Sequence, residues 1–377
     1  MIPDQNHTAI FGQSGSGKTG AVIHLMEEAL RNGVSVIAVD IKGDLANILT
    51  SGIRASYELY TPGADHGSQV SILDKLNSPE TAPDGVVGLL NLLGLESSKL
   101  HASYYSFLMA VIQQLGYSNI TIEDLLEEVV NPSFKQVGSL LVGHVLPEAK
   151  RDDLAVRLNN LQVDESMAPW LEGKSISFKP TSDGVPRCII YSVAHLHDTS
   201  QQQMAINMLL ADFKVWTFNQ SGTSNTRAIF VIDECDGLLP PHPKNPPTKQ
   251  NIMALAKKAR AFGVGLVLAT QNAKDIDYKV LSNCNTWLLG RLKTDIDRKR
   301  VLEGVDSLDV KDYKNVLATL QKREFVCVKG VSAQKWVSPD VASSLTGPYT
   351  NEQLASIYKP MCRSRINYLL SLIGIKS

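Results

Sequence analysis

Runs of almost continuous apolar residues, many of them β-branched, recur along the chain, as at residues 34–39 and 264–269. A strand with one exposed face alternates apolar and polar residues, whereas these runs do not alternate, which is typical of parallel strands covered on both faces. Amphipathic segments with helical spacing lie between several of the runs. The pattern predicts an α/β protein with a mostly parallel central sheet flanked by helices. The expected strands are 7–11, 34–40, 57–60, 187–193, 228–232, 263–270, 286–290 and, at the final edge, 325–328.

Residues 53–180 follow a different pattern, in which apolar residues after 57–60 recur mainly at helical spacing. The expected helices are 86–95, 103–115, 122–130 and 151–161. We interpret this part as a mostly helical insertion into the core. The predicted division of the chain is 1–52 for the first part of the core, 53–180 for the insertion, 181–335 for the second part of the core, and 336–377 for a C-terminal tail with helices near 351–357 and 365–373.

A glycine-rich loop directly follows the first expected strand. Residues 12–19 read GQSGSGKT, which fits G-x-x-x-x-G-K-[ST], and an amphipathic segment comes next. Glycines in such a loop let the main chain curl until its N–H groups point at phosphate oxygens. In this motif Lys18 reaches the β- and γ-phosphates, and the hydroxyl of Thr19 binds Mg²⁺. The expected nucleotide-binding residues are Gly12, Ser14, Gly15, Ser16, Gly17, Lys18, Thr19 and Gly20.

A second chemical signal lies at the end of the apolar run 228–232, which leads directly into Asp233 and Glu234. Beside a phosphate-binding loop, one such carboxylate holds Mg²⁺ through water and the other orients and deprotonates the attacking water. We assign the first role to Asp233 and the second to Glu234. The two motifs together predict an enzyme that hydrolyses ATP with the help of Mg²⁺.

Polar residues also follow the strand expected at 34–40. Asp40, Lys42 and Asp44 stand at its carboxyl end, where ligands bind in doubly wound sheets. These three residues either face the nucleotide and its metal ion or form a solvated turn.

Two later strand ends carry further candidates. Gln271 follows the strand at 263–270 and is expected to contact the γ-phosphate or the attacking water. Arg291 and Arg298 follow the strand at 286–290 and are candidate arginine fingers, which stabilise charge in the transition state. Their spacing does not decide whether they act within the subunit or on a neighbour.

Net charge and composition say little about the function of the chain as a whole, but one stretch of the sequence is locally basic. The net charge of the 377 residues is −1, so no overall positive field indicates nucleic acid. Positive charge gathers in a proline-rich loop at 240–249 and an expected helix at 252–261, which form either a track for a phosphate backbone or a solvated face. The five cysteines are scattered, as in reduced cytoplasmic proteins. No apolar run is long enough to span a membrane, so we expect a cytoplasmic protein without a membrane segment.

The combined pattern resembles that of the HerA/FtsK superfamily of P-loop motor ATPases, and more closely that of bacterial HerA-like ATP-binding proteins. The resemblance covers most of the chain. It rests on the loop at 12–19, VDIKGDL at 39–45, the Asp-Glu pair at 233–234, and the segments 259–272, 275–279, 285–292 and 347–350.

The resemblance implies a RecA-like P-loop NTPase fold, a ring that is often hexameric, ATP sites between subunits, and translocation of DNA. It also implies phosphate and metal binding by Lys18 and Thr19, metal and base roles for Asp233 and Glu234, and a sensor role for Gln271. The finger position of archaeal members matches 285–287, where this chain has a tryptophan, so Arg291 or Arg298 would substitute. Archaeal members also carry an N-terminal β-barrel, whereas eleven residues precede Gly12 here, so we expect no barrel.

We therefore expect an ATP-hydrolysing motor that serves as a DNA translocase or helicase subunit. The expected partners are further copies of the chain in a ring, with a hexamer as the expected form, then DNA, and a nuclease or another effector protein. One alternative is a motor for protein secretion or conjugation. Another is a nucleotide-dependent switch or scaffold that drives no transport.

Overall fold

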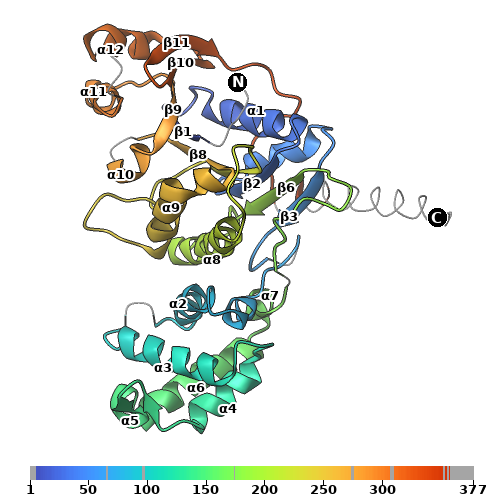
Figure 1. Cartoon of the computed structure of the whole chain (residues 1–377), viewed down its shortest axis with the longest axis vertical. Coiled ribbons are helices and arrows are strands. Elements are labelled where there is room, and N and C mark those ends of the chain that lie inside the picture. Colours follow the sequence, from blue (N-terminus) through green and yellow to red (C-terminus); the bar gives the residue numbers. More distant parts are fainter. Residues whose placement is uncertain are drawn as a thin grey trace, which may run out of the picture. The chain divides into compact units, whose positions relative to one another are not determined.

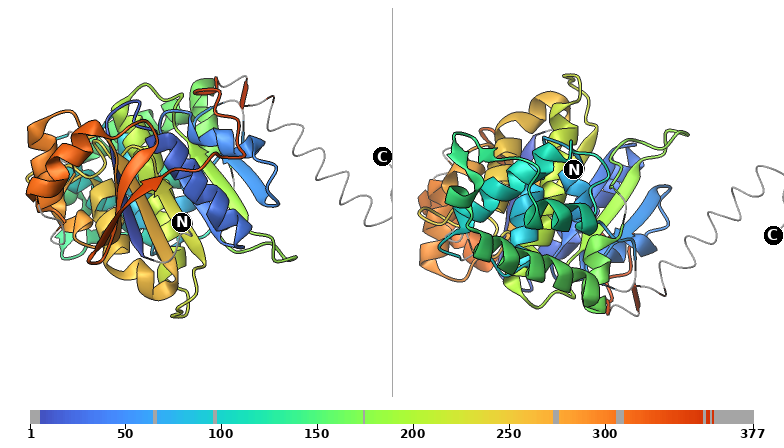
Figure 2. Two further views of the ribbon diagram at one scale, coloured as in Figure 1. Left: turned by 90° about the horizontal axis from the view of Figure 1, so that it is seen from above. Right: turned by 90° about the horizontal axis from the view of Figure 1, so that it is seen from below.

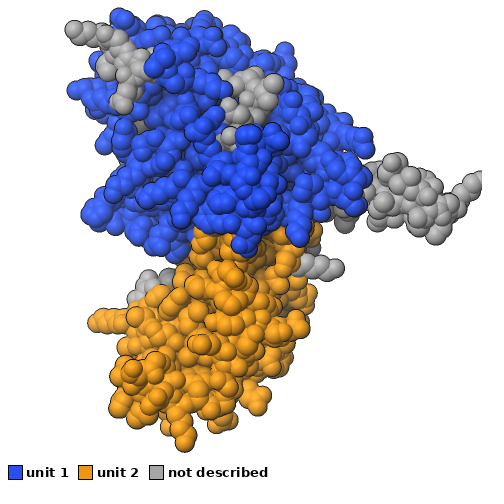
Figure 3. All heavy atoms as spheres, viewed as in Figure 1, with its two compact units in different colours: residues 1–60, 178–195, 216–377 blue, residues 61–177, 196–215 orange. Residues whose placement is uncertain are grey.

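The computed structural model describes residues 6–64, 67–95, 98–173, 175–272, 276–305, 310–350, 353, 354 and 356. The tail helix predicted at 365–373 lies outside these residues, and so does most of the one predicted at 351–357. The chain divides into two compact units, which Figure 3 colours separately. Unit 1 comprises Met1–Tyr60, Phe178–His195 and Trp216–Ser377, and unit 2 comprises Thr61–Ser177 and Leu196–Val215.

Unit 1 is built on a nine-stranded sheet with the strand order β11-β10-β9-β1-β8-β7-β2-β6-β3 (Figure 1). From β9 to β3 every pairing is parallel, whereas β10 pairs antiparallel with both β9 and β11. The predicted α/β fold with a mostly parallel sheet is therefore confirmed. The strands are β1 (His7–Phe11), β2 (Ser35–Asp40), β3 (Ser56–Tyr60), β6 (Arg187–Ser192), β7 (Ala228–Ile232), β8 (Val264–Thr270), β9 (Cys284–Leu289), β10 (Glu324–Lys329) and β11 (Ser332–Val337).

Helices cover both faces of this sheet, which explains the continuous apolar runs. In unit 1 they are α1 (Lys18–Arg31), α9 (Pro247–Lys258), α10 (Tyr278–Leu281), α11 (Asp295–Glu303) and α12 (Val310–Thr319), with 3₁₀ helices at Leu45–Thr50 and Ala259–Phe262.

The two faces of the sheet contact their helices in different ways, one through apolar packing and the other also through a polar contact. Helix α1 lies over the sheet (Figure 2), and its Leu25 belongs to one apolar core with Val36 and Val231. On the other face, His7 of β1 turns toward α9, where its Nε2 lies 3.0 Å from the carbonyl oxygen of Ala256. Every residue of β2, β7 and β8 is buried as a result.

The strand predicted at 325–328 as the final edge strand is not at the edge of the sheet. It corresponds to β10, and β11 follows it and forms the edge. No residue of β11 is fully buried, so it lacks the continuous apolar run by which the other strands were recognised.

Unit 2 is mostly helical. Its described helices are α2 (Ala82–Leu92), α3 (His101–Gln114), α4 (Ile122–Val130), α5 (Val142–Val145), α6 (Glu148–Val163), α7 (Ala168–Leu171) and the greater part of α8 (Thr199–Phe218), with 3₁₀ helices at Leu73–Asn77 and Glu165–Met167 and a small hairpin of β4 (Gln136–Val137) and β5 (Leu140–Leu141). Among the residues that the structure describes, no helix is both long and apolar enough to cross a membrane.

The two units do not coincide with the division predicted at residues 53 and 180. Strand β3 lies inside the predicted insertion, yet it pairs with β6 in the central sheet. Residues 196–215, placed in the second part of the core, belong to unit 2 instead. The difference arises because a periodicity change marks where helices begin, whereas a unit is defined by the contacts that its elements make.

Candidate nucleotide-binding site

The loop between β1 and α1 has a main-chain path that requires glycine. Gly15 has a φ of +77° and Gly17 a φ of +96°, values that residues with a Cβ adopt only with strain. A Cβ on Gly12 would lie 2.5 Å from the hydroxyl oxygen of Ser16. A Cβ on Gly17 would lie 2.9 Å from the main-chain nitrogen of Arg323. Close approach of surrounding atoms therefore explains Gly12 and Gly17, and the positive φ explains Gly15 and Gly17.

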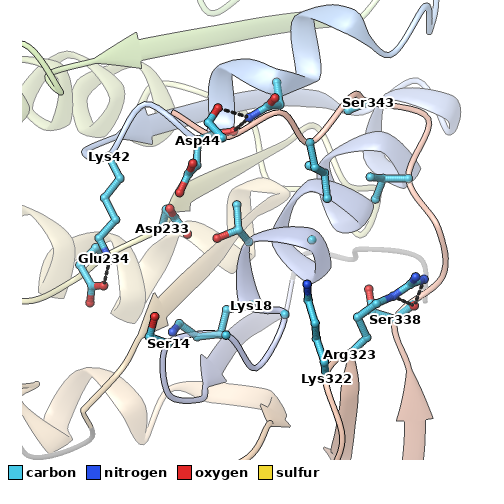
Figure 4. A pocket seen from close by; sticks show the side chains of 18 of the residues that line it. Ser14, Lys18, Lys42, Asp44, Asp233, Glu234, Lys322, Arg323, Ser338 and Ser343 are labelled. Carbon is cyan, nitrogen blue, oxygen red and sulfur yellow. Dashed lines mark hydrogen bonds and ion pairs between the residues drawn. The ribbon is translucent and has the colours of Figure 1, made fainter. Parts of the chain in front are cut away.

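A cavity of about 650 Å³ opens beside this loop and the start of α1 (Figure 4). Most of the predicted nucleotide-binding residues line it: Ser14, Gly15, Gly17, Lys18, Thr19 and Gly20. Gly12 and Ser16 do not line the cavity. Gly12 accepts a hydrogen bond of 2.5 Å from Lys18 Nζ, and the buried hydroxyl of Ser16 has no partner among the described residues. A cavity of this size and polarity is typical of a small-ligand site.

Lys18 places a positive charge inside the cavity. Burial lowers its pKa below the ordinary value, while the carboxylate of Glu234 acts in the opposite direction. A buried ammonium group is stabilised by any anion that approaches it. Phosphate oxygens in the cavity would meet this requirement, as the motif predicts.

The strand order brings the predicted catalytic residues together. Strand β8 lies between β1 and β7, so the loop, Gln271 and the pair Asp233-Glu234 follow three neighbouring parallel strands. The carboxyl ends of such strands meet at one edge of the sheet. Gln271, Asp233 and Glu234 all line the same cavity as the loop.

Asp233 and Thr19 fit a divalent cation that binds together with a nucleotide. Asp233 is 4% exposed, and burial, followed by the nearby carboxylate of Asp40, raises its pKa to about 7. A cation would offset both effects. The described residues contain no cluster of three or more His, Cys, Asp and Glu side chains that could hold a metal ion unaided. A Mg²⁺ ion bound to phosphates needs only one or two protein ligands, so Thr19 and Asp233 suffice.

The residues after β2 take two different positions. Lys42 and Asp44 line the cavity, and Lys42 Nζ lies 2.5 Å from Oε2 of Glu234. Asp40 is fully buried and accepts main-chain hydrogen bonds from Gly43 at 2.8 Å and Ala46 at 3.0 Å. Of the two readings that the sequence left open, the structure favours the cavity for Lys42 and Asp44, and a structural role for Asp40.

The two candidate fingers do not line this cavity. The carbonyl oxygen of Arg291 accepts a hydrogen bond of 3.0 Å from the main-chain N–H of Gln13, so its main chain adjoins the loop. The guanidinium group of Arg298 is bound to the segment before its helix, since it donates to the carbonyls of Leu292 and Lys293, both at 2.7 Å. Arg298 therefore does not reach the cavity of its own chain in this conformation.

One wall of the cavity was missed by the sequence reasoning. It comes from Lys322 and Arg323, before β10, and from residues 338–347, which were predicted as part of the tail. The main-chain N–H of Arg323 donates to the carbonyl of Ser16 at 2.8 Å, and its guanidinium group donates to Ser338 (Figure 4). No motif marks this wall, because many of its hydrogen bonds are made by its own main-chain atoms, which every residue type carries.

The basic stretch predicted at 240–261 is also divided. Lys249 is buried and forms an ion pair of 2.6 Å with Asp277, so it is structural. Lys257, Lys258 and Arg260 are exposed, and they line a second cavity of about 660 Å³. That cavity, which we call the basic groove, is the described surface that keeps the DNA interpretation open.

The loop, the Asp-Glu pair and the parallel sheet define a P-loop nucleoside triphosphatase. Residues 5–174 match the family described as Helicase HerA, central domain. The chain is 25% identical over 336 residues to the DNA double-strand break repair helicase HerA of Sulfurisphaera tokodaii, a match over 86% of this chain and 62% of that protein. It is 20% identical over 338 residues to the probable helicase MJ1565 of Methanocaldococcus jannaschii, a match over 86% of this chain and 60% of that protein.

Solved structures show the same fold at low identity. VirB4 of Thermoanaerobacter pseudethanolicus aligns with a TM-score of 0.62 at 16% identity, covering 93% of this chain and 91% of that one. The plasmid coupling protein TrwB in complex with ADP and Mg²⁺ aligns with a TM-score of 0.59 at 12% identity, covering 92% and 87%. These findings confirm the RecA-like fold and support the resemblance to HerA/FtsK-type P-loop ATPases. The chain spans about three fifths of the length of the two helicases.

Proposed function

We propose that the protein is an ATP-hydrolysing motor subunit that moves along or unwinds DNA. One observation carries the proposal: the phosphate-binding loop, the Asp233-Glu234 pair and Gln271 line a single cavity. These parts suit hydrolysis, since they supply phosphate binding, a metal ligand and a base beside one another.

In this mechanism the main-chain N–H groups of the loop and Lys18 hold the phosphates. Thr19 and Asp233 are the expected ligands of Mg²⁺, which neutralises charge on the phosphates when bound. Glu234 takes the proton of the attacking water, and Gln271, which donates to Glu234 at 3.1 Å, keeps the carboxylate and the water aligned. The water oxygen forms a bond to the γ-phosphorus while the bond from that phosphorus to the bridging oxygen breaks, so the products are inorganic phosphate and ADP, which keeps the bridging oxygen.

DNA is proposed as the transported polymer. The basic groove supplies three exposed positive charges, and two aromatic rings, Phe218 and Phe262, lie 5.7 Å apart beside it. Lys258 Nζ is 5.9 Å from the ring of Phe218. Positive side chains with neighbouring aromatic rings suit a nucleic-acid backbone and its bases. The curated relatives named as helicases support the same choice.

The proposal includes a ring of identical subunits, with a hexamer as the expected form. In such a ring Arg291 or Arg298 of one subunit would reach the site of the next, since neither lines the cavity of its own chain. A nuclease or another effector protein is the proposed partner. A cytoplasmic location is also proposed, supported by four free, buried cysteines among the described residues.

The experiment that tests the proposal is the rate of ATP hydrolysis without DNA, with duplex DNA and with single-stranded DNA, over a salt series. We expect DNA to raise the rate, and the increase to fade as salt rises. The variant Glu234→Gln is the control for contaminating ATPases. DNA that neither binds nor stimulates hydrolysis at low salt would contradict the DNA part of the proposal.

A conjugation or secretion motor is the second candidate, favoured by the shared fold with VirB4 and TrwB. The same experiment separates the two, because a motor for protein would hydrolyse ATP without a response to DNA. A switch or scaffold would hydrolyse ATP very slowly and remain monomeric with and without ATP, which light scattering measures.

A further inference from the structure

Lys42 contacts the proposed catalytic base directly. Its ammonium nitrogen lies 2.5 Å from Oε2 of Glu234, and Gln271 donates to the same oxygen at 3.1 Å. The other oxygen, Oε1, is buried and has no hydrogen-bond partner among the described residues. One oxygen of the carboxylate is thus shared by two donors, while the other has none.

The main chain holds Lys42 in this position. Asp40 accepts hydrogen bonds from the N–H groups of Gly43 and Ala46, which closes a tight turn around Lys42. Gly43 has a φ of +84°. Tyr349 also donates a main-chain hydrogen bond of 3.4 Å to the carbonyl of Gly43. A turn fixed on both sides directs the lysine side chain from the end of β2 toward the end of β7 (Figure 4).

The ion pair opposes the proposed role of Glu234. A base must hold the attacking water within hydrogen-bond reach before it can take a proton from it. Two donors occupy the lone pairs of Oε2 through which the carboxylate would hold an attacking water. In this arrangement Oε2 of Glu234 is therefore not free to hold the attacking water.

Lys42 can also leave Glu234 for another anion at little cost in free energy. The side chain of Lys42 is 42% exposed, and an ion pair open to water contributes little net stability. Lys42 lines the same cavity as Lys18. A terminal phosphate carries more negative charge than a carboxylate and accepts strong, charge-assisted hydrogen bonds.

We propose that Lys42 is a positioning residue for hydrolysis, which leaves Glu234 for the terminal phosphate when a nucleoside triphosphate binds. The inference rests on the proposed ATPase function. The exchange releases Oε2 for the attacking water, and Gln271 continues to orient the carboxylate. A diphosphate has no terminal phosphate in this place, so Lys42 stays on Glu234. The base is then available only when there is a bond to hydrolyse.

The test measures the affinities for ATPγS and ADP, both with Mg²⁺, by titration calorimetry. In Lys42→Met we expect affinity for ATPγS to fall about tenfold and affinity for ADP to change by no more than about twofold. Lys42→Arg should restore the preference for the triphosphate. Glu234→Gln removes the competing charge, so it should raise affinity for ATPγS about threefold or more, and only while Lys42 is present. Lys150→Met, at an exposed position of α6, is the matched control and should change neither affinity.

Equal losses for ATPγS and ADP in Lys42→Met would overturn the inference. An identical gain from Glu234→Gln in the wild-type and Lys42→Met backgrounds would overturn it as well. A wild-type protein that binds both nucleotides without hydrolysing ATP would contradict the proposed function, while the affinities would still decide the role of Lys42. A protein that binds neither nucleotide would overturn both.

Discussion

The buried carboxylate of Glu27 on α1 accepts two hydrogen bonds from Ser343, at 2.8 Å from its main-chain N–H and at 2.6 Å from its hydroxyl. It accepts a third, of 3.0 Å, from the N–H of Ala342. These bonds tie the segment 338–347 to the helix that begins at the phosphate-binding loop. The segment is a wall of the nucleotide cavity, so Glu27 connects the stability of the fold to the shape of the site.

Glu27→Gln should destabilise the protein and weaken nucleotide binding. The amide leaves at least one donor of the segment without a charged acceptor in a buried place, which costs about 2 kcal/mol. We expect a lower midpoint in urea and weaker binding of ADP. Glu28→Gln is the matched control, because Glu28 is partly exposed and its ion pair with Arg31 lies at the surface, and it should change the free energy of unfolding by less than about 0.5 kcal/mol. Equal effects of the two variants would show that the contact with Ser343 is unimportant.

Lys18→Ala and Glu234→Gln should both abolish turnover, for different reasons. Lys18→Ala removes the charge that holds the phosphates, so both binding and hydrolysis should fall, the latter by about a hundredfold or more. Glu234→Gln removes the base and should reduce kcat by about a hundredfold or more while ATP still binds. Steady-state hydrolysis and ATP binding are measured side by side. Retained turnover in Glu234→Gln would exclude this residue as the base.

Replacing the basic side chains of the basic groove should weaken DNA binding without changing the binding of ATP. In the triple variant of Lys257, Lys258 and Arg260 to Gln, we expect the slope of log affinity against log salt to fall by about two to three. The control with the same change in net charge is Lys150, Lys299 and Lys335 to Gln, three exposed lysines outside the groove. Equal slopes in the two triple variants would place the DNA elsewhere.

His7 should make stability depend on pH below neutrality. Burial lowers its pKa to about 4, and its two ring nitrogens contact Leu266 N–H and the carbonyl of Ala256, both at 3.0 Å. The unfolded chain takes up the proton near pH 6.5, whereas the folded chain does so only near pH 4. The contribution of the neutral ring is therefore complete above pH 6.5 and lost as pH falls toward 4, up to about 3 kcal/mol.

The free energy of unfolding, measured by urea titration from pH 7 to pH 4, tests this dependence. In His7→Gln the pH slope should be smaller than in the wild type by about one proton. His144→Gln, at an exposed position of unit 2, is the control and should keep the wild-type slope. A wild-type slope in His7→Gln would assign the pH dependence to other groups.

The sequence predicted the parts of the site that are encoded by consecutive residues. The loop needs glycines at fixed spacing, and Asp233-Glu234 stands at the end of an apolar run, so both are visible without a structure. Gln271 was also found, because β8 ends at the same edge as β1 and β7.

Contacts between distant segments could not be predicted in the same way. The ion pair of Lys42 with Glu234 joins residues 192 positions apart, and neither the residue types nor their spacing predicts it. Arg298 was a candidate finger because arginine after a core strand is a general signal, yet its hydrogen bonds to Leu292 and Lys293 depend on a local helix start. The boundaries of unit 2 were missed for a related reason. Strand β3 lies in the mostly helical part of the sequence but pairs with β6 in the sheet, and most of α8 lies among the core strands in sequence but belongs to unit 2.

The nucleotide cavity joins the loop at residues 12–20 with the wall at residues 338–347. During synthesis the loop therefore leaves the ribosome long before its wall exists. A nascent chain can present its phosphate-binding loop to ATP only in an incomplete form, because the segment that Glu27 anchors is made last of all the cavity's parts. Full-strength nucleotide binding thus requires that the chain has been made and folded as far as residue 347, and a truncation before residue 338 would remove it while leaving both sequence motifs intact.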